Sequence, residues 1–159
     1  MAGFRLSLTL LLMAFFTMTA GCNTDAPPSR LPVIISGRTF QLELALDDAT
    51  RIKGLSGRDH LDADGGMIFV FPGVARRRFW MKDCLVPIDI IFLDPAGRVM
   101  AMHRMVPEPG VADADLKAYS SNWPAQFAIE LRGGALDELS VKPQQTIALP
   151  LADLKRWAD

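Results

Sequence analysis

Two acidic side chains that interrupt apolar runs are the residues best suited to chemistry. Asp89 lies in the stretch VPIDIIFLD, and Glu130 lies in FAIEL. An unpaired carboxylate in apolar surroundings is costly, so it finds a partner or takes up a proton. Two carboxyl groups of unequal pKa in one cleft could serve as the acid and base of a hydrolase. The sequence does not give their separation, and a structural ion pair is the better explanation of Asp89.

Basic and aromatic residues near these acids could complete a binding site. On a strand, Trp80 and Lys82 point the same way, so the lysine either lies along the indole or helps it to grip an anion. Arg51 and Arg58 are further possible partners for Asp89. We therefore predict a pocket of mixed charge for a small polar ligand or a peptide segment. Its predicted ligand-binding residues are Arg51, Arg58, Trp80, Lys82, Asp89 and Glu130.

Other reactive side chains give weaker signals. The stretch VMAMHRM, Val99 to Met105, contains soft ligands that suit Cu(I), but alternation places His103 and Met105 opposite Met100 and Met102. A methionine-rich core strand is the better interpretation, so we predict neither a metal site nor a cofactor. Cys84 is expected to be inert towards thiol reagents if it is buried beside Trp80. The arginine run 76–78 is interpreted as a solvated loop.

The elements that must position these residues are mostly short strands. Residues 31–36 and 39–46 form a predicted hairpin with Gly37 at its turn, and a short helix follows Asp47. A buried strand at 67–71 ends at the turn signal Pro72-Gly73. Further strands are predicted at 79–83, 88–94, 98–105, 127–131 and 145–149, with a second helix at 134–139. The predicted class is mainly β (α+β), a compact antiparallel curled sheet or barrel of about seven strands with two short helices.

The first residues resemble a secretory leader. Residues 1–21 contain Arg5, an apolar run and small residues before Cys22, as in a signal peptide. Thr19-Ala20-Gly21-Cys22 resembles a lipobox, whose cysteine is acylated. We therefore expect a lipidated tether at 22–30, a domain at 31–150 and a tail at 151–159. The protein would be secreted across the inner membrane and anchored on its periplasmic side.

The overall charge is close to neutral, at −1 for the 159 residues. This argues against a nucleic-acid partner held through its phosphates. No CxxC metal site and no disulfide framework is possible, because the chain has only Cys22 and Cys84.

Several motifs together resemble the DUF192 family, which comprises small bacterial and archaeal domains of unknown function that are often secreted. The motifs are GLSGRDHLDADGGMIFVF, FWMKDCLVPIDIIFLDPAGRV, AYSS and FAIEL, and the resemblance spans about residues 31–149. The family pattern maps onto Arg51, Arg58, Gly66-Met67, Phe79 to Lys82, Pro87, Asp89, and Glu130 with Gly133. Asp83 and Cys84 replace the usual Asn-Thr, and Ser56 replaces a common Met. The resemblance implies a mainly β fold and no catalytic assignment.

Three functions are compatible with these observations. The first is a membrane-tethered extracytoplasmic binding module. The second is a hydrolase that uses Asp89 and Glu130, which requires both carboxyl groups to face one cleft. The third is a structural or accessory lipoprotein without a pocket.

Overall fold

The computed structural model describes residues 26–158, and the chain begins its sheet with a hairpin. Strands β1 (Arg30–Ile35) and β2 (Arg38–Ala45) pair antiparallel. Ser36 and Gly37 have φ values of 49° and 81°, the left-handed conformation that tight hairpin turns require. Alternate β1 residues are buried, as the period of a half-buried strand predicts. The predicted hairpin is confirmed.

A crossover through a helix then makes the next pair of strands parallel, although antiparallel pairing was expected. Helix α1 (Asp48–Lys53) leads to the long strand β3 (Gly65–Phe79), which lies parallel to β2. At Gly66, an added Cβ would lie 2.4 Å from the Glu130 carbonyl oxygen and 2.9 Å from the Leu42 side chain. Only glycine allows β3 to fit at this point. The prediction of a wholly antiparallel sheet was wrong here, because the α1 crossover brings the chain back to the same end of the sheet.

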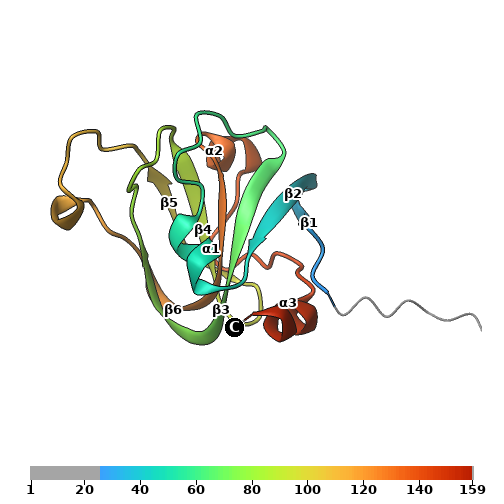
Figure 1. Cartoon of the computed structure of the whole chain (residues 1–159). Coiled ribbons are helices and arrows are strands. Elements are labelled where there is room, and N and C mark those ends of the chain that lie inside the picture. Colours follow the sequence, from blue (N-terminus) through green and yellow to red (C-terminus); the bar gives the residue numbers. More distant parts are fainter. Residues whose placement is uncertain (1–25, 159) are drawn as a thin grey trace, which may run out of the picture.

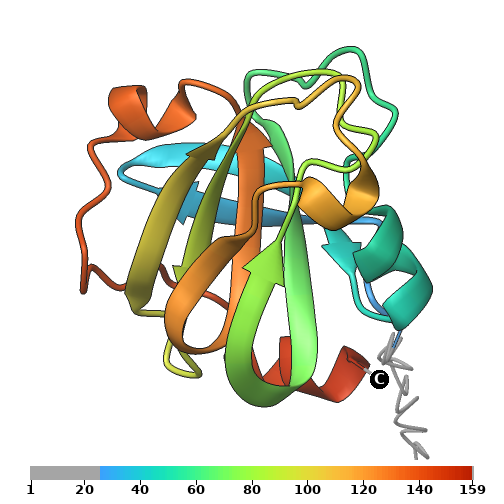
Figure 2. The same ribbon diagram turned by 90° about the vertical axis from the view of Figure 1, so that its left-hand side faces the viewer.

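The remaining strands complete one open sheet. Strand β6 (Tyr119–Arg132) lies between β3 and β4 (Ile88–Leu93), and β4 pairs with the edge strand β5 (Val99–Met105). The strand order is β1-β2-β3-β6-β4-β5, and every pairing except β2–β3 is antiparallel. The sheet curls strongly, so the β1–β2 hairpin crosses one end while β3 and β6 run past it (Figures 1 and 2). The predicted mainly β class is confirmed.

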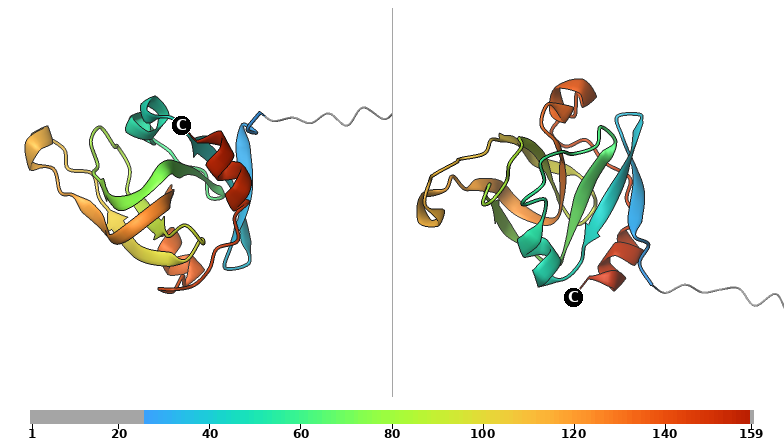
Figure 3. Two further views of the ribbon diagram at one scale, coloured as in Figure 1. Left: turned by 90° about the horizontal axis from the view of Figure 1, so that it is seen from below. Right: turned by 45° about the horizontal axis from the view of Figure 1, so that its top comes forward.

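Both faces of the sheet bury apolar side chains. One face packs Phe40, Ile68 and Ile129 beneath α2 (Ala135–Leu139) and α3 (Leu151–Trp157). The opposite face packs Phe69, Ile90 and Phe92. Figure 3 shows the curled sheet from below, with α3 beside the β1–β2 hairpin. A single-turn helix, η1 (Asp113–Asp115), lies in the loop before β6. Within residues 26–158, no helix has the length and hydropathy needed to cross a bilayer.

Three local predictions were wrong for identifiable reasons. Pro72-Gly73 does not end a strand but lies in a bulge of β3, where proline costs no ladder hydrogen bond. The predicted strand 79–83 ends at Phe79, and Asp83 adopts a positive φ of 54° in the following loop. The predicted strand 145–149 is reduced to a single bridge between Arg98 and Thr146. The predicted leader and Cys22 lie outside the described residues.

Candidate functional site

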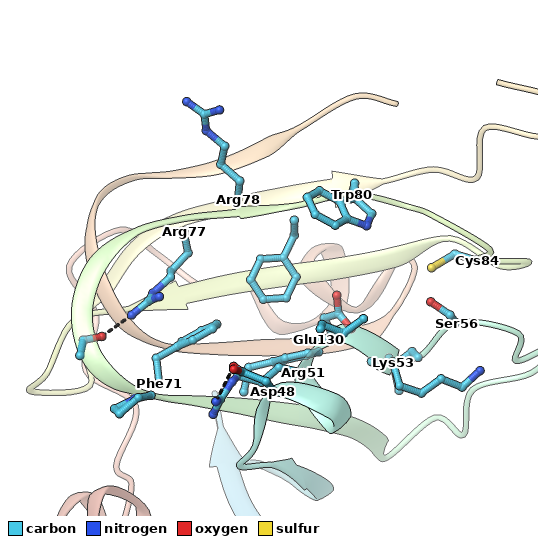
Figure 4. Close-up of a pocket in the computed structure, with 17 residues that line it drawn as sticks. Asp48, Arg51, Lys53, Ser56, Phe71, Arg77, Arg78, Trp80, Cys84 and Glu130 are labelled. Atoms are coloured by element: carbon cyan, nitrogen blue, oxygen red, sulfur yellow. Dashed lines mark hydrogen bonds and ion pairs between the residues drawn. The ribbon is translucent and has the colours of Figure 1, made fainter. Parts of the chain in front are cut away.

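A groove of about 680 Å³ opens between α1, the outer half of β3 and the loop that follows Phe79. Its walls carry Phe69, Phe71, Phe79 and Trp80. Four cationic side chains, Arg51, Lys53, Arg77 and Arg78, also line it, and Glu130 of β6 lies in its floor (Figure 4). An apolar cleft with a few polar groups is the usual form of a small-molecule site.

Local sequence fixes the helical wall of the groove. The Asp47 side chain accepts a hydrogen bond from the Thr50 backbone N–H at 2.8 Å and so caps α1. The helix ends at Gly54, which has a φ of 48°. An added Cβ there would lie 3.4 Å from the Phe69 ring and 3.8 Å from Glu130 Oε2. Gly54 therefore leaves open the space in front of the Glu130 carboxyl group.

Aromatic packing fixes the floor and the opposite wall. The Phe79 ring makes edge contacts with Phe69 at 4.9 Å and with Phe92 at 5.4 Å between centroids. These arrangements are the favoured ones for aromatic pairs. Trp80 follows this cluster and is 56% exposed, so its indole offers a surface to the groove. The floor is closely packed, whereas Trp80 is accessible.

Glu130 is a buried acid without a partner. It is 5% exposed, and the residues opposite it on the neighbouring strands are Met67 and Ile90. Within the described part of the chain, its carboxyl group makes no hydrogen bond. Burial raises its pKa to about 8, and the positive charge of Arg58 opposes this only in part. Near neutral pH the group is therefore mainly an uncharged acid that can both donate and accept a hydrogen bond.

Two of the arginines in the groove already have structural contacts. The Arg51 Nη1 donates to the carbonyl oxygens of Leu46 at 2.5 Å and Val70 at 2.7 Å, which ties α1 to the sheet. The Arg77 guanidinium lies 3.9 Å from the centre of the Phe71 ring and donates to the Gly73 carbonyl. Because arginine is a cation in proteins, both side chains add positive charge to the groove while also holding its walls.

The other two cations of the groove make no structural contacts of this kind within the described residues. Lys53 and Arg78 are exposed, and within residues 26–158 neither forms a hydrogen bond or ion pair. Arg78 extends away from the floor in Figure 4. These side chains can therefore turn towards an anion without breaking an existing contact.

A thiol and a hydroxyl lie near the Glu130 end of the groove. The Ser56 Oγ donates to the Lys82 carbonyl oxygen at 2.9 Å, and the Cys84 Sγ lies 3.6 Å from the same oxygen. Burial, with a smaller effect of the Glu130 charge, raises the pKa of the Cys84 thiol. A raised pKa reduces the thiolate fraction, which is the nucleophilic form.

The structure brings together half of the predicted binding residues: Arg51, Trp80 and Glu130 line the groove. Arg58 instead makes a bidentate ion pair with Glu43, at 2.7 and 2.8 Å. Lys82 pairs with Asp113 on an exposed loop.

Asp89 lies on the other face of the sheet, where its Oδ2 accepts from the Leu136 backbone N–H at 2.8 Å. It is 1% exposed, and burial raises its pKa. This acid holds the start of α2 and does not reach the groove. A hydrolase that uses Asp89 and Glu130 as a pair does not fit this geometry.

Sequence reasoning missed Lys53, Phe71 and Arg77 as groove residues, and it left Cys84 out of the predicted site. The turn signal Pro72-Gly73 predicts a solvated loop at 76–78, whereas β3 continues through this run to Phe79. Had the strand been continued to Phe79, alternation would have placed Arg77 on the same side as Phe79. The alternation of side chains along a continued strand was therefore the signal that could have identified Arg77.

The described residues contain no cluster of three or more His, Cys, Asp or Glu side chains suited to a metal ion. The residues of the copper alternative are divided between the two faces of β5. Met102 packs with one core, whereas Met105 is buried in the other. The His103 Nε2 lies 2.7 Å from the Ser120 carbonyl oxygen.

Comparison with known proteins supports the fold and the family. One similar crystal structure is that of a candidate transcription regulator from Sinorhizobium meliloti 1021, with 30% identity and a TM-score of 0.64, covering 75% of this chain and 91% of that one. A second is a protein of unknown function from Novosphingobium aromaticivorans DSM 12444, with 30% identity and a TM-score of 0.65, covering 76% and 85%. No match was found among curated proteins. Residues 32–149 match the family DUF192, described as "Uncharacterized ACR". The chain belongs to the DUF192 family.

Proposed function

We propose that this protein is a membrane-tethered extracytoplasmic binding module whose groove takes a small ligand with a flat apolar body and an anionic group. The observation that carries the proposal is the groove itself. Four aromatic side chains line it beside four cations, and its only acids are Asp48 and Glu130. Aromatic walls suit an apolar body, and arginine and lysine suit carboxylates, sulfonates or phosphates.

Binding accounts for these residues better than catalysis does. A hydrolytic nucleophile needs an activating base or a lowered pKa. The Cys84 pKa is raised, and Ser56 donates its hydroxyl to a backbone carbonyl. Asp89, the second carboxyl group of the predicted catalytic pair, lies on the opposite face of the sheet from Glu130. The groove therefore holds recognition groups without an assembled catalytic set.

The tether is part of the same proposal and rests on the sequence of residues 1–30. Acylation of Cys22 would keep the domain at a membrane surface. The Cys22→Ala variant should move from the membrane fraction to the soluble periplasmic fraction when cells are separated into these compartments. An unchanged distribution of Cys22→Ala would argue against the lipid anchor while leaving the groove unaffected.

A fluorescent anion tests the binding function. The probe 8-anilinonaphthalene-1-sulfonate has a flat aromatic body and a sulfonate, and its emission rises in apolar sites. The Trp80→Ala variant of the full chain should bind it about threefold to tenfold more weakly, because one aromatic contact is lost.

Trp123→Ala is the matched control. Trp123 is 58% exposed, compared with 56% for Trp80, and does not line the groove. Its affinity for the probe should stay at the wild-type value. Wild type, Trp80→Ala and Trp123→Ala all contain the same residues 1–25. Any probe that binds to those residues therefore cancels when the affinities of the three proteins are compared. Equal affinities of Trp80→Ala and wild type would overturn the binding proposal and favour an accessory lipoprotein without a ligand site.

A further inference from the structure

The Glu130 carboxyl group is the least explained polar group in the groove. It is 95% buried by side-chain and backbone neighbours, as its 5% exposure shows, yet it faces the open space in front of Gly54. Buried polar groups in folded proteins almost always have a hydrogen-bond partner. In the described part of the chain its carboxyl group makes no hydrogen bond, and no fully buried side-chain oxygen there lacks a partner, so the Glu130 oxygens are open to the groove. A missing partner at the floor of a groove points to a ligand atom.

We propose that the ligand is an anion and that the Glu130 carboxylic acid donates a hydrogen bond to it from the floor of the groove. This inference rests on the proposed function and specifies its ligand. The ligand places an acceptor oxygen, such as that of a carboxylate or sulfonate, in front of Gly54. Its apolar body lies along Phe71 and Trp80, and the cationic rim balances its charge.

The surrounding charges favour an anion over an ammonium group. Arg51, Lys53, Arg77 and Arg78 line the same groove and repel a cation. Arg58, whose positive charge lowers the pKa of Glu130, makes both of its short contacts with Glu43. It therefore does little to stabilise an ionised Glu130. An ammonium ligand would need that ionised form and would enter a positive site.

The titratable neighbours of Glu130 define the expected pH response. Arg58 faces it from the segment after α1, Cys84 from the loop after β3, and Lys53 lines the groove from α1. The neighbours across β3 and β4 are Met67 and Ile90, which do not titrate. Since burial raises the pKa of Glu130 to about 8, this acid loses its proton as the pH rises through that value. Ionisation removes the donor and places a negative charge against the bound anion.

Two matched probes test the inference. The sulfonate probe and N-phenyl-1-naphthylamine share the same aromatic body, and only the first is anionic. For wild type, the affinity for the sulfonate should fall on the order of tenfold between about pH 7 and about pH 9. The affinity for the uncharged amine should not change over this range. In Glu130→Gln the amide still donates but cannot ionise, so sulfonate binding should persist and should lose this pH dependence.

A measurement on the wild-type protein keeps the test independent of the variant's folding. Titration calorimetry at about pH 8.5, in buffers of different ionisation enthalpy, should show that sulfonate binding takes up protons. Proton release or no exchange would overturn the inference. It would also be overturned if Glu130→Gln and wild type had the same pH profile while Trp80 still mattered for binding, and in that case the proposed function would survive. If neither probe depends on Trp80, the proposed function itself fails.

Discussion

Asp89 and Glu130 lie on adjacent strands and point to opposite faces of the sheet. On the ladder between β4 and β6, Asp89 is opposite Leu131, and Glu130 is opposite Ile90. Cross-strand partners share a face, so the offset of one residue separates the two acids. One of them supports a helix, and the other lies open to a groove. Their common feature in the sequence, an acid within an apolar strand, therefore has two different physical explanations.

Removing the Asp89 carboxyl group should destabilise the fold without affecting the groove. In Asp89→Ala the part-buried Leu136 N–H loses its acceptor, which should lower the free energy of unfolding by about 1–3 kcal/mol. Urea unfolding measures this change, and the affinity for the sulfonate probe should remain that of wild type.

Asp137→Ala is the control for that measurement, because its side chain is 62% exposed and pairs with Arg104 on the surface. Its stability should stay close to that of wild type. A stable Asp89→Ala protein that no longer bound the probe would contradict the structural role given to Asp89.

Much of the fold followed from local sequence signals. Alternation predicted the β1–β2 hairpin, and the apolar runs predicted β4 and the inner half of β3. The parallel pair was not predictable in the same way, because the pairing of β3 depends on where the α1 crossover returns the chain. The Pro72-Gly73 signal was misread for a related reason. Proline breaks a ladder only where a partner strand needs its N–H, and in β3 that partner is locally absent.

The candidate site was predictable only in part, because partner choice depends on distant segments. Arg58 is neutralised by Glu43 of β2, and Lys82 is neutralised by Asp113 in the loop before β6. Nothing in the local sequence of Arg58 or Lys82 identifies those acids. Glu130 could be recognised because its environment is dictated by its own strand, with apolar residues on both sides of it. The sequence therefore identified the residue whose environment comes from its own strand, and it could not identify the ion pairs made with distant segments.

The Cys84 thiol should react slowly in the folded protein. It is half-buried and its pKa is raised, so near neutral pH the folded state presents less thiolate than a free cysteine does. In a full chain that carries Cys22→Ser, Cys84 is the only thiol. Its labelling by 5,5′-dithiobis(2-nitrobenzoate) should be at least about tenfold slower than in urea. Equal rates in the folded and unfolded protein would show that the thiol is freely accessible.

Glu130 should make the stability of the protein fall as the pH rises. Its pKa is about 8 in the folded protein, compared with an ordinary value of 4.5, so between these values the folded state holds a proton that the unfolded state has released. The stabilisation is complete below about pH 4.5 and is lost as the pH rises through 8. Relative to Glu130→Gln, wild type should lose roughly 1.4 kcal/mol of unfolding free energy per pH unit over this window.

Urea unfolding of both proteins at several pH values measures that difference. Glu138→Gln is the control, because Glu138 is exposed and its ion pair with Arg132 lowers its pKa. The stabilisation that Glu138 provides is lost only as the pH falls below the ordinary pKa of a glutamate. The free energies of unfolding of Glu138→Gln and wild type should therefore change in parallel with pH above about pH 5. A constant difference between wild type and Glu130→Gln across the same range would mean that Glu130 is already ionised near neutral pH. The groove would then have a negative floor and would suit a cationic ligand instead.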